Sequence, residues 1–159
     1  MSSPRRHTVI TLLRAVHDAM VDELIARLHA AGHPDIRRAH SSVFENLDRD
    51  GTRLTVLADR AQMTHPSMSE LVSAVERLGY VERVRDTADG RARVVCFTPA
   101  GRNLQRLALT ETAEVEAAWL ERLGPRVGAG LRTALLTALD TAEAEPSPEA
   151  VDPGGMAGR

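Results

Sequence analysis

The middle of the chain carries the sequence pattern that most restricts how the protein can fold. Two short segments with helical spacing of apolar residues follow each other closely, and Thr55 and Thr64 stand where helix N-caps are expected. Two Val- and Arg-rich runs come next, Tyr80–Arg85 and Arg93–Phe97, and the pair Asp89-Gly90 between them favours a turn. This order predicts two helices joined by a tight turn, with a β-hairpin after them, and the two helices have the layout of a helix-turn-helix.

The second of these helices is predicted to begin after Thr64 and to end near Leu78. Met68, Val72 and Val75 recur at helical spacing and would form its buried face. The outer face then carries mainly small polar side chains. These outer residues are Thr64, His65, Ser67, Ser69, Glu70 and Ser73.

A long helix is predicted ahead of this region, from His7 to Ala31. Its apolar residues fall at helical spacing, and they are Val9, Leu13, Val16, Met20, Leu24 and Leu28. Ile10, Leu12 and Ile25 extend the apolar surface to a second flank. Because so long a helix has little of its own chain to pack against, we expect it to meet a partner subunit.

The segment after this helix is predicted to be helical as well. Gly32 and Pro34 end the first helix, and Asp35 is expected to cap a helix from Ile36 to about Leu47. The inner face of that helix would consist of Ile36, Ala39, Val43 and Leu47.

Two further helices are predicted after the hairpin. One runs from about Gly101 to Leu123, and the other follows Gly124-Pro125. The tail from Ala144 to Arg159 is rich in Pro, Glu, Gly and Ala and is predicted to be disordered.

The composition fits a helical protein and excludes several other classes. Hydrophobic residues make up 43% of the 159 residues and aromatic residues only 3%, which favours a core of packed aliphatic helices. The single Cys excludes an intramolecular disulfide, and no apolar run approaches the ~20 residues that span a bilayer. The N-terminus also lacks the pattern of a signal peptide, so we expect a soluble cytoplasmic protein.

The formal net charge of -2 hides an uneven distribution. All 20 basic residues are Arg, and residues 1–102 hold 15 of them against 13 acidic residues. Arg83, Arg85, Arg91 and Arg93 all lie on the predicted hairpin. A near-neutral total therefore does not exclude binding of nucleic acid by one part of the chain.

Four short segments, in order along the chain, resemble the MarR (multiple antibiotic resistance regulator) family. Leu54–Ala61 is similar to the family's pattern L-T-x-x-L-A-x-x, and Val75–Arg83 is similar to L-E-x-x-G-(L/Y)-(V/I)-x-R. Asp86–Ala92 is similar to the wing signature D-x-x-D-x-R, and Phe97–Gly101 to L-T-x-x-G. The resemblance covers the chain from about residue 54 to residue 101.

The resemblance implies a mostly α-helical fold with a small β-hairpin wing, in which a winged helix-turn-helix is flanked by long dimerisation helices. The chain would divide into four parts: an N-terminal dimerisation helix (7–33), the winged helix-turn-helix (35–100), C-terminal dimerisation helices (101–143) and the tail (144–159). The implied function is a DNA-binding transcriptional regulator, a repressor, that binds a pseudo-palindromic operator as a homodimer. A small-molecule effector would release it from DNA.

The expected DNA contacts lie on the second helix of the motif and on the hairpin. An α-helix fits the major groove, and the resemblance implies that Arg91 enters the minor groove with Asp89 orienting its guanidinium. Pro66 and Gly90 depart from the family's pattern. The residues expected at DNA are Thr64, His65, Pro66, Ser67, Ser69, Ser73, Arg85, Asp89, Arg91 and Arg93. The alternative is that the serines are merely solvated and the arginines form ion pairs within the hairpin.

Three kinds of signal are compatible with such a regulator. A small-molecule pocket would be lined by His17, Met20, His40, Phe44 and Trp119. The alternative is that these side chains are ordinary core residues with no ligand. His29, His33 and His40 form a histidine cluster, but helix-breaking residues interrupt it, so no metal site is predicted. Cys96 lies in a predicted strand among apolar neighbours and is expected to be buried and inert.

An enzyme is not expected. The sequence holds no Gly-rich phosphate loop, no Ser elbow and no HExxH motif, and it implies no cofactor. Asp86 and Asp89 stand among arginines, which favour structural ion pairs over acid catalysis. The expected partners are double-stranded DNA, a second copy of the chain and a small-molecule effector, and no membrane. The alternatives are a metal- or redox-responsive regulator of the same fold and, in a different class, a helical adaptor that binds protein rather than DNA.

Overall fold

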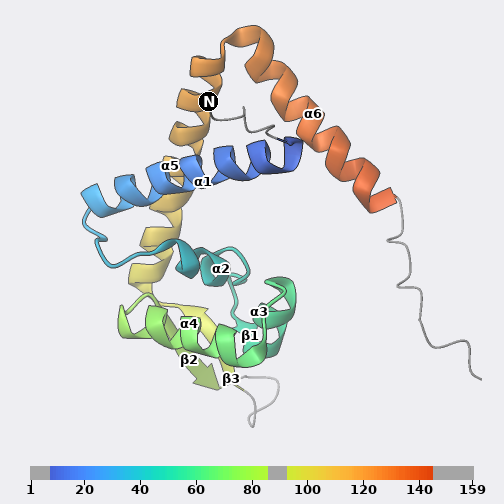
Figure 1. Cartoon of the computed structure of the whole chain (residues 1–159). Helices are drawn as coiled ribbons and strands as arrows, with labels where there is room; N and C mark the ends of the chain where they lie inside the picture. The colour runs from blue at the N-terminus through green and yellow to red at the C-terminus, as the bar shows by residue number, and fades with distance from the viewer. Residues whose placement is uncertain (1–7, 86–92, 145–159) are drawn as a thin grey trace, which may run out of the picture. The chain divides into compact units, whose positions relative to one another are not determined.

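The computed structural model describes residues 8–85 and 93–144 of the chain. The chain divides into two compact units, residues 1–116 and 117–159. The elements, labelled in Figure 1, are α1 (Val9–Ala30), η1 (Arg38–His40), α2 (Ser41–Phe44), β1 (Thr52–Arg53), α3 (Leu54–Arg60), α4 (His65–Arg77), β2 (Val81–Arg85), β3 (Arg93–Phe97), α5 (Pro99–Leu123) and α6 (Pro125–Ala144). The predicted fold class is confirmed: helices dominate, and a small sheet follows a helix-turn-helix.

The sheet has three antiparallel strands in the order β1-β3-β2. The predicted hairpin is confirmed, with Val81 opposite Phe97 and Arg85 opposite Arg93. The third strand, β1, was not predicted, because two residues are too few to show an alternating pattern. Strand β1 pairs with β3, and Gly51, the residue before β1, has a φ of +94° and lies so close to β3 that a Cβ there would be 2.5 Å from the Cys96 Sγ.

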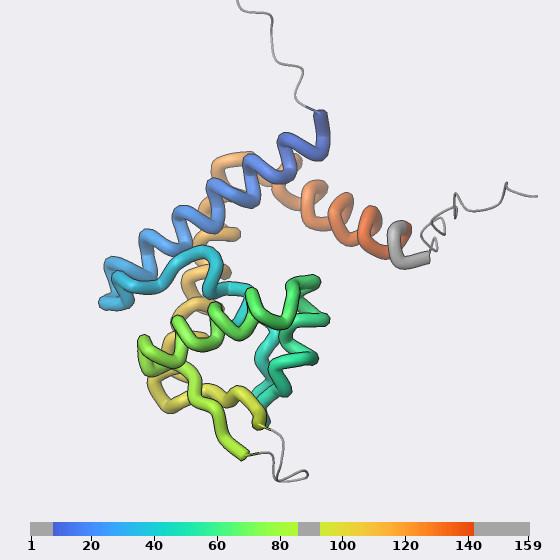
Figure 2. The backbone as a smooth tube through the Cα atoms, turned by 60° about the horizontal axis from the view of Figure 1, so that its bottom comes forward, coloured from blue at the N-terminus to red at the C-terminus, as the bar shows by residue number. Residues whose placement is uncertain are grey.

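The main core lies between α3, α4 and the sheet. Leu57 of α3 and Met68, Val72 and Val75 of α4 have exposed fractions of 0%, which confirms the predicted buried face of α4. From the strands, Val81, Val95 and Phe97 belong to the same cluster. Figure 2 shows the tube passing from α3 through a tight turn into α4 and on into β2. One face of α4 is thus fixed against the core, and the opposite face is left to solvent.

The predicted helix from Ile36 to about Leu47 is wrong. The segment forms only the short η1 and α2, and Ala39, assigned to the inner face, is exposed. Side chains replace the helical hydrogen bonds here, because the His40 Nδ1 accepts from the Arg37 N–H and the Asn46 amide donates to the Ser42 carbonyl. Such local side-chain bonds compete with a regular helix. The residue before η1 is Arg37, so Asp35 is not its N-cap.

Two other predictions concern helix ends. The N-cap position of α3 is Arg53 rather than Thr55, so the helix begins at Leu54. Thr64 is confirmed as the N-cap of α4, since its Oγ1 accepts from the Ser67 N–H. The long helices α1, α5 and α6 are confirmed with ends within two residues of those predicted.

Half of the six residues expected on the buried face of α1 are exposed in the single chain. Leu28 is buried, but Val9, Leu13 and Val16 have exposed fractions of 71%, 46% and 39%. Leu28 packs with Ile36 and Leu104 in a second, smaller cluster. The C-terminal half of α1 is therefore anchored to its own chain, while the N-terminal half presents apolar side chains to solvent.

The second unit consists of the end of α5 and α6. Leu135, Leu136 and Leu139 of α6 are exposed, and the helix approaches Leu120 closely at Gly128, where a Cβ would lie 3.0 Å from the Leu120 carbonyl oxygen. Among the described residues, no helix is long and apolar enough to cross a membrane. The predicted disordered tail falls, beyond Ala144, outside the described residues.

Candidate nucleic-acid interface and ligand pocket

The N-terminal turn of α4 presents a group of exposed polar side chains. The Thr64 Oγ1 lies 3.4 Å from the Ser67 backbone nitrogen, from which it accepts, and 2.9 Å from the Ser67 Oγ. His65 and Pro66 are exposed beside them, and Ser69 is half-buried one turn later. Pro66 occupies the first turn, where its missing N–H has no helical partner to lose. The N-terminal turn is therefore ordered by its own cap and open to a partner.

Arg83 locks α4 to strand β2. Its guanidinium pairs with the Glu76 carboxylate and donates to the Ser73 Oγ at 3.0 Å and to the Ser69 carbonyl at 3.3 Å, while its backbone N–H donates to the Glu76 Oε1 at 3.2 Å. The Arg83 side chain is only 22% exposed. We call Arg83, Glu76, Ser73 and Ser69 the α4–β2 clamp.

The clamp changes the interpretation of two predicted site residues. The Ser73 hydroxyl donates to the Ser69 carbonyl at 2.8 Å and also accepts from Arg83, so it is engaged within the protein. The role of Arg83 was missed, although Glu76 and Arg83 both stand in the matched segment Val75–Arg83. The spacing alone did not show that the two side chains meet across a turn.

Two arginines stand directly opposite each other at the open end of the described hairpin. Arg85 on β2 is the cross-strand partner of Arg93 on β3, and both are exposed. Within the described residues no ion pair joins either of them to a carboxylate. Like charges in a directly opposite pair are unfavourable unless an anion lies between or beside them. Asp89 and Arg91, the other two predicted hairpin residues, lie outside the described residues.

Sequence reasoning also missed Arg77. It is exposed at the C-terminal end of α4 and lines a shallow depression with Pro66, Ser69, Glu70 and Ser73. These residues share one face of the helix, so the polar face of α4 extends along its whole length. On α4, the last residue predicted to contact DNA was Ser73, one turn before Arg77.

A pocket of about 610 Å³ opens between α1, the η1–α2 segment and the part of α5 in the first unit. Its apolar wall includes Leu24, Leu28, Phe44 and Leu104. Two of the five predicted pocket residues, His17 and Phe44, line it. The other three, Met20, His40 and Trp119, do not line it. The full set of lining residues is His17, Val21, Leu24, Ile25, Leu28, Ile36, Arg37, Arg38, Ser41, Phe44, Glu45, Leu104, Gln105, Ala108, Leu109 and Thr112.

The three clustered histidines each have a different partner. The His29 Nε2 lies 2.7 Å from the Ile36 carbonyl oxygen, and the His33 Nδ1 lies 2.7 Å from the Tyr80 hydroxyl. His40 is buried, and burial, with the nearby Arg37 charge, lowers the pKa of its imidazole. The described part of the chain holds no group of three or more His, Cys, Asp or Glu side chains placed for a metal ion.

Cys96 is half-buried on β3, facing the turn that precedes β1. Its Sγ lies 4.0 Å from the Asp50 carbonyl oxygen. Burial, helped by the Glu82 carboxylate, raises the pKa of the Cys96 thiol. A raised pKa lowers the fraction of reactive thiolate, as expected of an inert thiol, but the side chain is less buried than predicted.

Comparisons with known proteins show which family and which solved structures the chain is similar to. Residues 35–92 match the sequence profile of the MarR family. Transcriptional regulator HosA of Escherichia coli O157:H7 is 29% identical over 91 residues, which cover 57% of this chain and 67% of HosA. CouR from Rhodococcus jostii RHA1, solved with p-coumaroyl-CoA, has a TM-score of 0.68 at 21% identity, and the match covers 95% of this chain and 100% of the CouR chain. The S. aureus MepR–DNA complex has a TM-score of 0.64 at 21% identity over 84% of this chain and 98% of MepR.

These findings confirm the resemblance found in the sequence. Residues 35–92, which include the helix-turn-helix, match the MarR family, and the fold of the chain is shared with CouR and MepR.

Proposed function

We propose that the chain is a repressor that reads operator DNA with α4 and grips the DNA backbone with the hairpin. The opposed pair Arg85 and Arg93 is the observation that carries the proposal, because two exposed arginines at directly opposite strand positions favour the binding of a phosphate. Beside it, α4 is anchored on one face by Met68 and Val72, which leaves its polar face for the major groove.

Roles follow for the predicted DNA residues. A recognition helix usually contacts base edges with its N-terminal turns. On α4 these turns carry Thr64, His65, Pro66, Ser67 and Ser69. Ser73 acts through the α4–β2 clamp, which keeps the helix in register with the hairpin. Arg85 and Arg93 contact phosphates, and the proposal extends to Asp89 and Arg91, which lie between them in the sequence. The MepR structure bound to DNA supports this use of the fold.

Binding to DNA by this surface is expected to depend steeply on salt. A protein that neutralises six or more phosphates loses about a thousandfold in affinity between roughly 50 mM and 200 mM salt, because bound counterions are released from the DNA. The test is a titration of the full chain with a duplex from the DNA flanking its own coding sequence, repeated across salt concentrations. A helical adaptor that binds only protein would leave the duplex free at every concentration.

A homodimer is part of the proposal. The N-terminal half of α1 exposes Val9, Ile10 and Leu13, and α6 exposes Leu135 and Leu139, which a second copy would cover. Two copies related by a two-fold axis would meet half-sites about 34 Å apart, one turn of the duplex. The boundaries 7–33 and 101–143 for the dimerisation helices, with the DNA-binding part at 35–100, are proposed on the same grounds.

Removing α6 is therefore expected to separate the copies. A chain ending at Leu123 should elute as a monomer and lose DNA affinity at least about a hundredfold, because each half-site contact then binds alone. Size-exclusion with light scattering measures the first effect and a gel shift the second, with circular dichroism as the check that α1–α5 still fold. A shortened chain that stays dimeric and binds its duplex normally would show that neither dimerisation nor DNA binding needs α6.

Release by a small molecule completes the proposal. The pocket between α1, η1–α2 and α5 is lined mainly by apolar residues and by a few polar ones, as ligand sites commonly are. CouR, which shares the fold, was solved with p-coumaroyl-CoA. A metal or thiol signal is less well supported, because the three histidines face separate partners and the Cys96 thiol has a raised pKa. Regulation of this kind needs no catalytic step and takes place where the DNA is, in the cytoplasm.

A further inference from the structure

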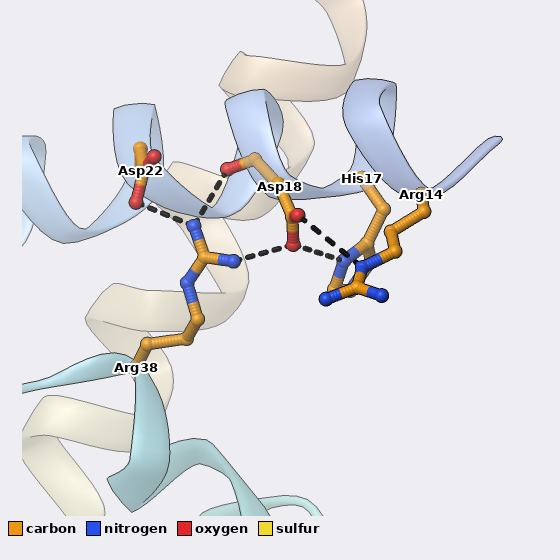
Figure 3. A network of polar contacts seen from close by, with 5 residues as sticks. All are labelled: Arg14, His17, Asp18, Asp22 and Arg38. Carbon is orange, nitrogen blue, oxygen red and sulfur yellow. Dashed lines mark hydrogen bonds and ion pairs between the residues drawn. The ribbon is translucent and has the colours of Figure 1, made fainter. Parts of the chain in front are cut away.

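Arg38 links the first helix to the segment that leads into the helix-turn-helix. Figure 3 shows its guanidinium reaching from η1 toward the facing side of α1. Its Nη1 lies 2.5 Å from the Asp18 Oδ1, and its Nη2 lies 2.6 Å from the Asp22 Oδ1 and 3.0 Å from the Asp18 carbonyl oxygen. Asp18 and Asp22 are one turn apart on α1, so a single arginine fork spans both. We call these three residues the Arg38 clasp.

The clasp adjoins the pocket through Arg38. Arg38 lines the pocket directly, and so does His17, whose Nδ1 lies 3.5 Å from the Asp18 Oδ1. Glu45, just beyond α2, is also a lining residue. A molecule entering the pocket would therefore touch both elements that the clasp holds together.

The η1–α2 segment also reaches the core beneath α4. Phe44, at the end of α2, lines the pocket and stacks on Phe97 of β3 at 6.1 Å between ring centroids. Its ring also meets Tyr80, the residue before β2, at 6.3 Å. A shift of η1 relative to α1 would therefore move Phe44 and change its packing against β3 and Tyr80, next to the strand to which α4 is clamped.

We propose that Arg38 is a positioning residue for DNA binding: the clasp holds η1–α2 against α1 and so sets the placement of α4, and pocket occupancy acts on DNA binding by opening it. The charged partners are accessible, with side-chain exposures of 41% for Arg38, 40% for Asp18 and 73% for Asp22. Ion pairs at such exposure are individually weak, which suits a contact that must open and close. The inference rests on the proposed DNA-binding function.

A direct phosphate contact by Arg38 is the competing explanation, and the two differ in the sign of one result. Replacing Asp18 and Asp22 by Asn removes two negative charges, so simple electrostatics predicts equal or tighter DNA binding. The clasp predicts the opposite, because the double Asp18→Asn, Asp22→Asn variant loses the same link as Arg38→Gln. The matched control is Arg14→Gln, since Arg14 touches the same Asp18 at 3.9 Å but lies on α1 itself.

The experiment compares these variants of the full chain in two measurements. Hydrogen exchange of the backbone amides in residues 36–44 should become about tenfold faster in Arg38→Gln and in the double Asp variant, and stay unchanged in Arg14→Gln. Affinity for the duplex flanking the coding sequence should fall about tenfold in the same two variants. Arg38→Lys should lie between, because lysine keeps the charge but not the fork.

The outcomes separate cleanly. Weaker binding in Arg38→Gln with normal or tighter binding in the double Asp variant overturns the clasp in favour of a phosphate contact. Faster exchange with unchanged affinity would mean that the clasp holds the two elements together but does not affect DNA binding. Unchanged exchange would mean that the clasp does not hold them together at all. Either result contradicts the proposal. If the wild-type chain prefers its flanking duplex no more than a scrambled one, the proposed function fails, and the exchange data alone decide whether the clasp exists.

Discussion

Arg83→Ala is expected to weaken DNA binding about tenfold and to lower the free energy of unfolding by about 1–3 kcal/mol. The substitution removes the guanidinium of the α4–β2 clamp, and with it the pairing to Glu76 and the bonds to Ser69 and Ser73. The Glu76 carboxylate, 35% exposed, loses its partner, and the Ser69 carbonyl loses one of its donors. Without the clamp, α4 can shift against β2. We then expect that its polar face and the Arg85–Arg93 pair can no longer contact the same duplex at the same time.

Denaturant unfolding and fluorescence anisotropy with labelled duplex measure the two effects. Arg85→Ala is the matched control for stability, because Arg85 lies two residues along the same strand and is exposed. Its free energy of unfolding should stay within about 0.5 kcal/mol of the wild type. Equal stability of Arg83→Ala and Arg85→Ala would mean that the clamp contributes nothing to the fold.

Gly101→Val is expected to prevent stable folding. A Cβ at residue 101 would lie 1.8 Å from the Tyr80 carbonyl oxygen and 3.2 Å from the Phe97 Cδ1. The carbonyl cannot move away easily, because it accepts from the Thr98 N–H at 3.1 Å and belongs to the turn between α4 and β2. Overpacking against backbone, where no side chain can rotate aside, should destabilise the chain by roughly 4 kcal/mol or more, a large part of an ordinary domain's stability.

Circular dichroism and thermal unfolding of the purified chain test this expectation. Gly130→Ala is the control, because a Cβ there meets nothing within 4 Å and alanine favours the helix, so stability should be equal or slightly higher. A Gly101→Val chain that unfolds cooperatively near the wild-type temperature would show that α5 does not begin as closely against Tyr80 as the structure places it.

The parts of the fold that were predictable from the sequence are those fixed by local pattern. The inner face of α4 follows from the spacing of Met68, Val72 and Val75, and Thr64 caps that helix as its position indicated. The hairpin follows from two β-branched runs. By contrast, β1 owes its existence to β3, and the break after α2 depends on bonds made by His40 and Asn46, which no periodicity reveals.

The candidate site divides in the same way. Exposed residues of α4, such as His65 and Ser67, could be named because the buried ones define the opposite face. The clamp at Arg83 and the clasp at Arg38 could not be found by spacing, because each joins side chains that only the folded chain brings together. The pocket shows the same limit: His17 and Phe44 line it, but its apolar wall comes mostly from aliphatic residues that any helix would bury.

We propose that α4 reads the base sequence, while the hairpin supplies affinity without reading it. The most direct test is the ratio of affinities for the flanking duplex and for a scrambled duplex of equal length. The double variant His65→Ala, Ser67→Ala should lower this ratio roughly 10- to 100-fold, because groups facing base edges are lost. Arg93→Ala should weaken binding to both duplexes by the same factor and leave the ratio unchanged. A ratio that survives the α4 substitutions would contradict the account.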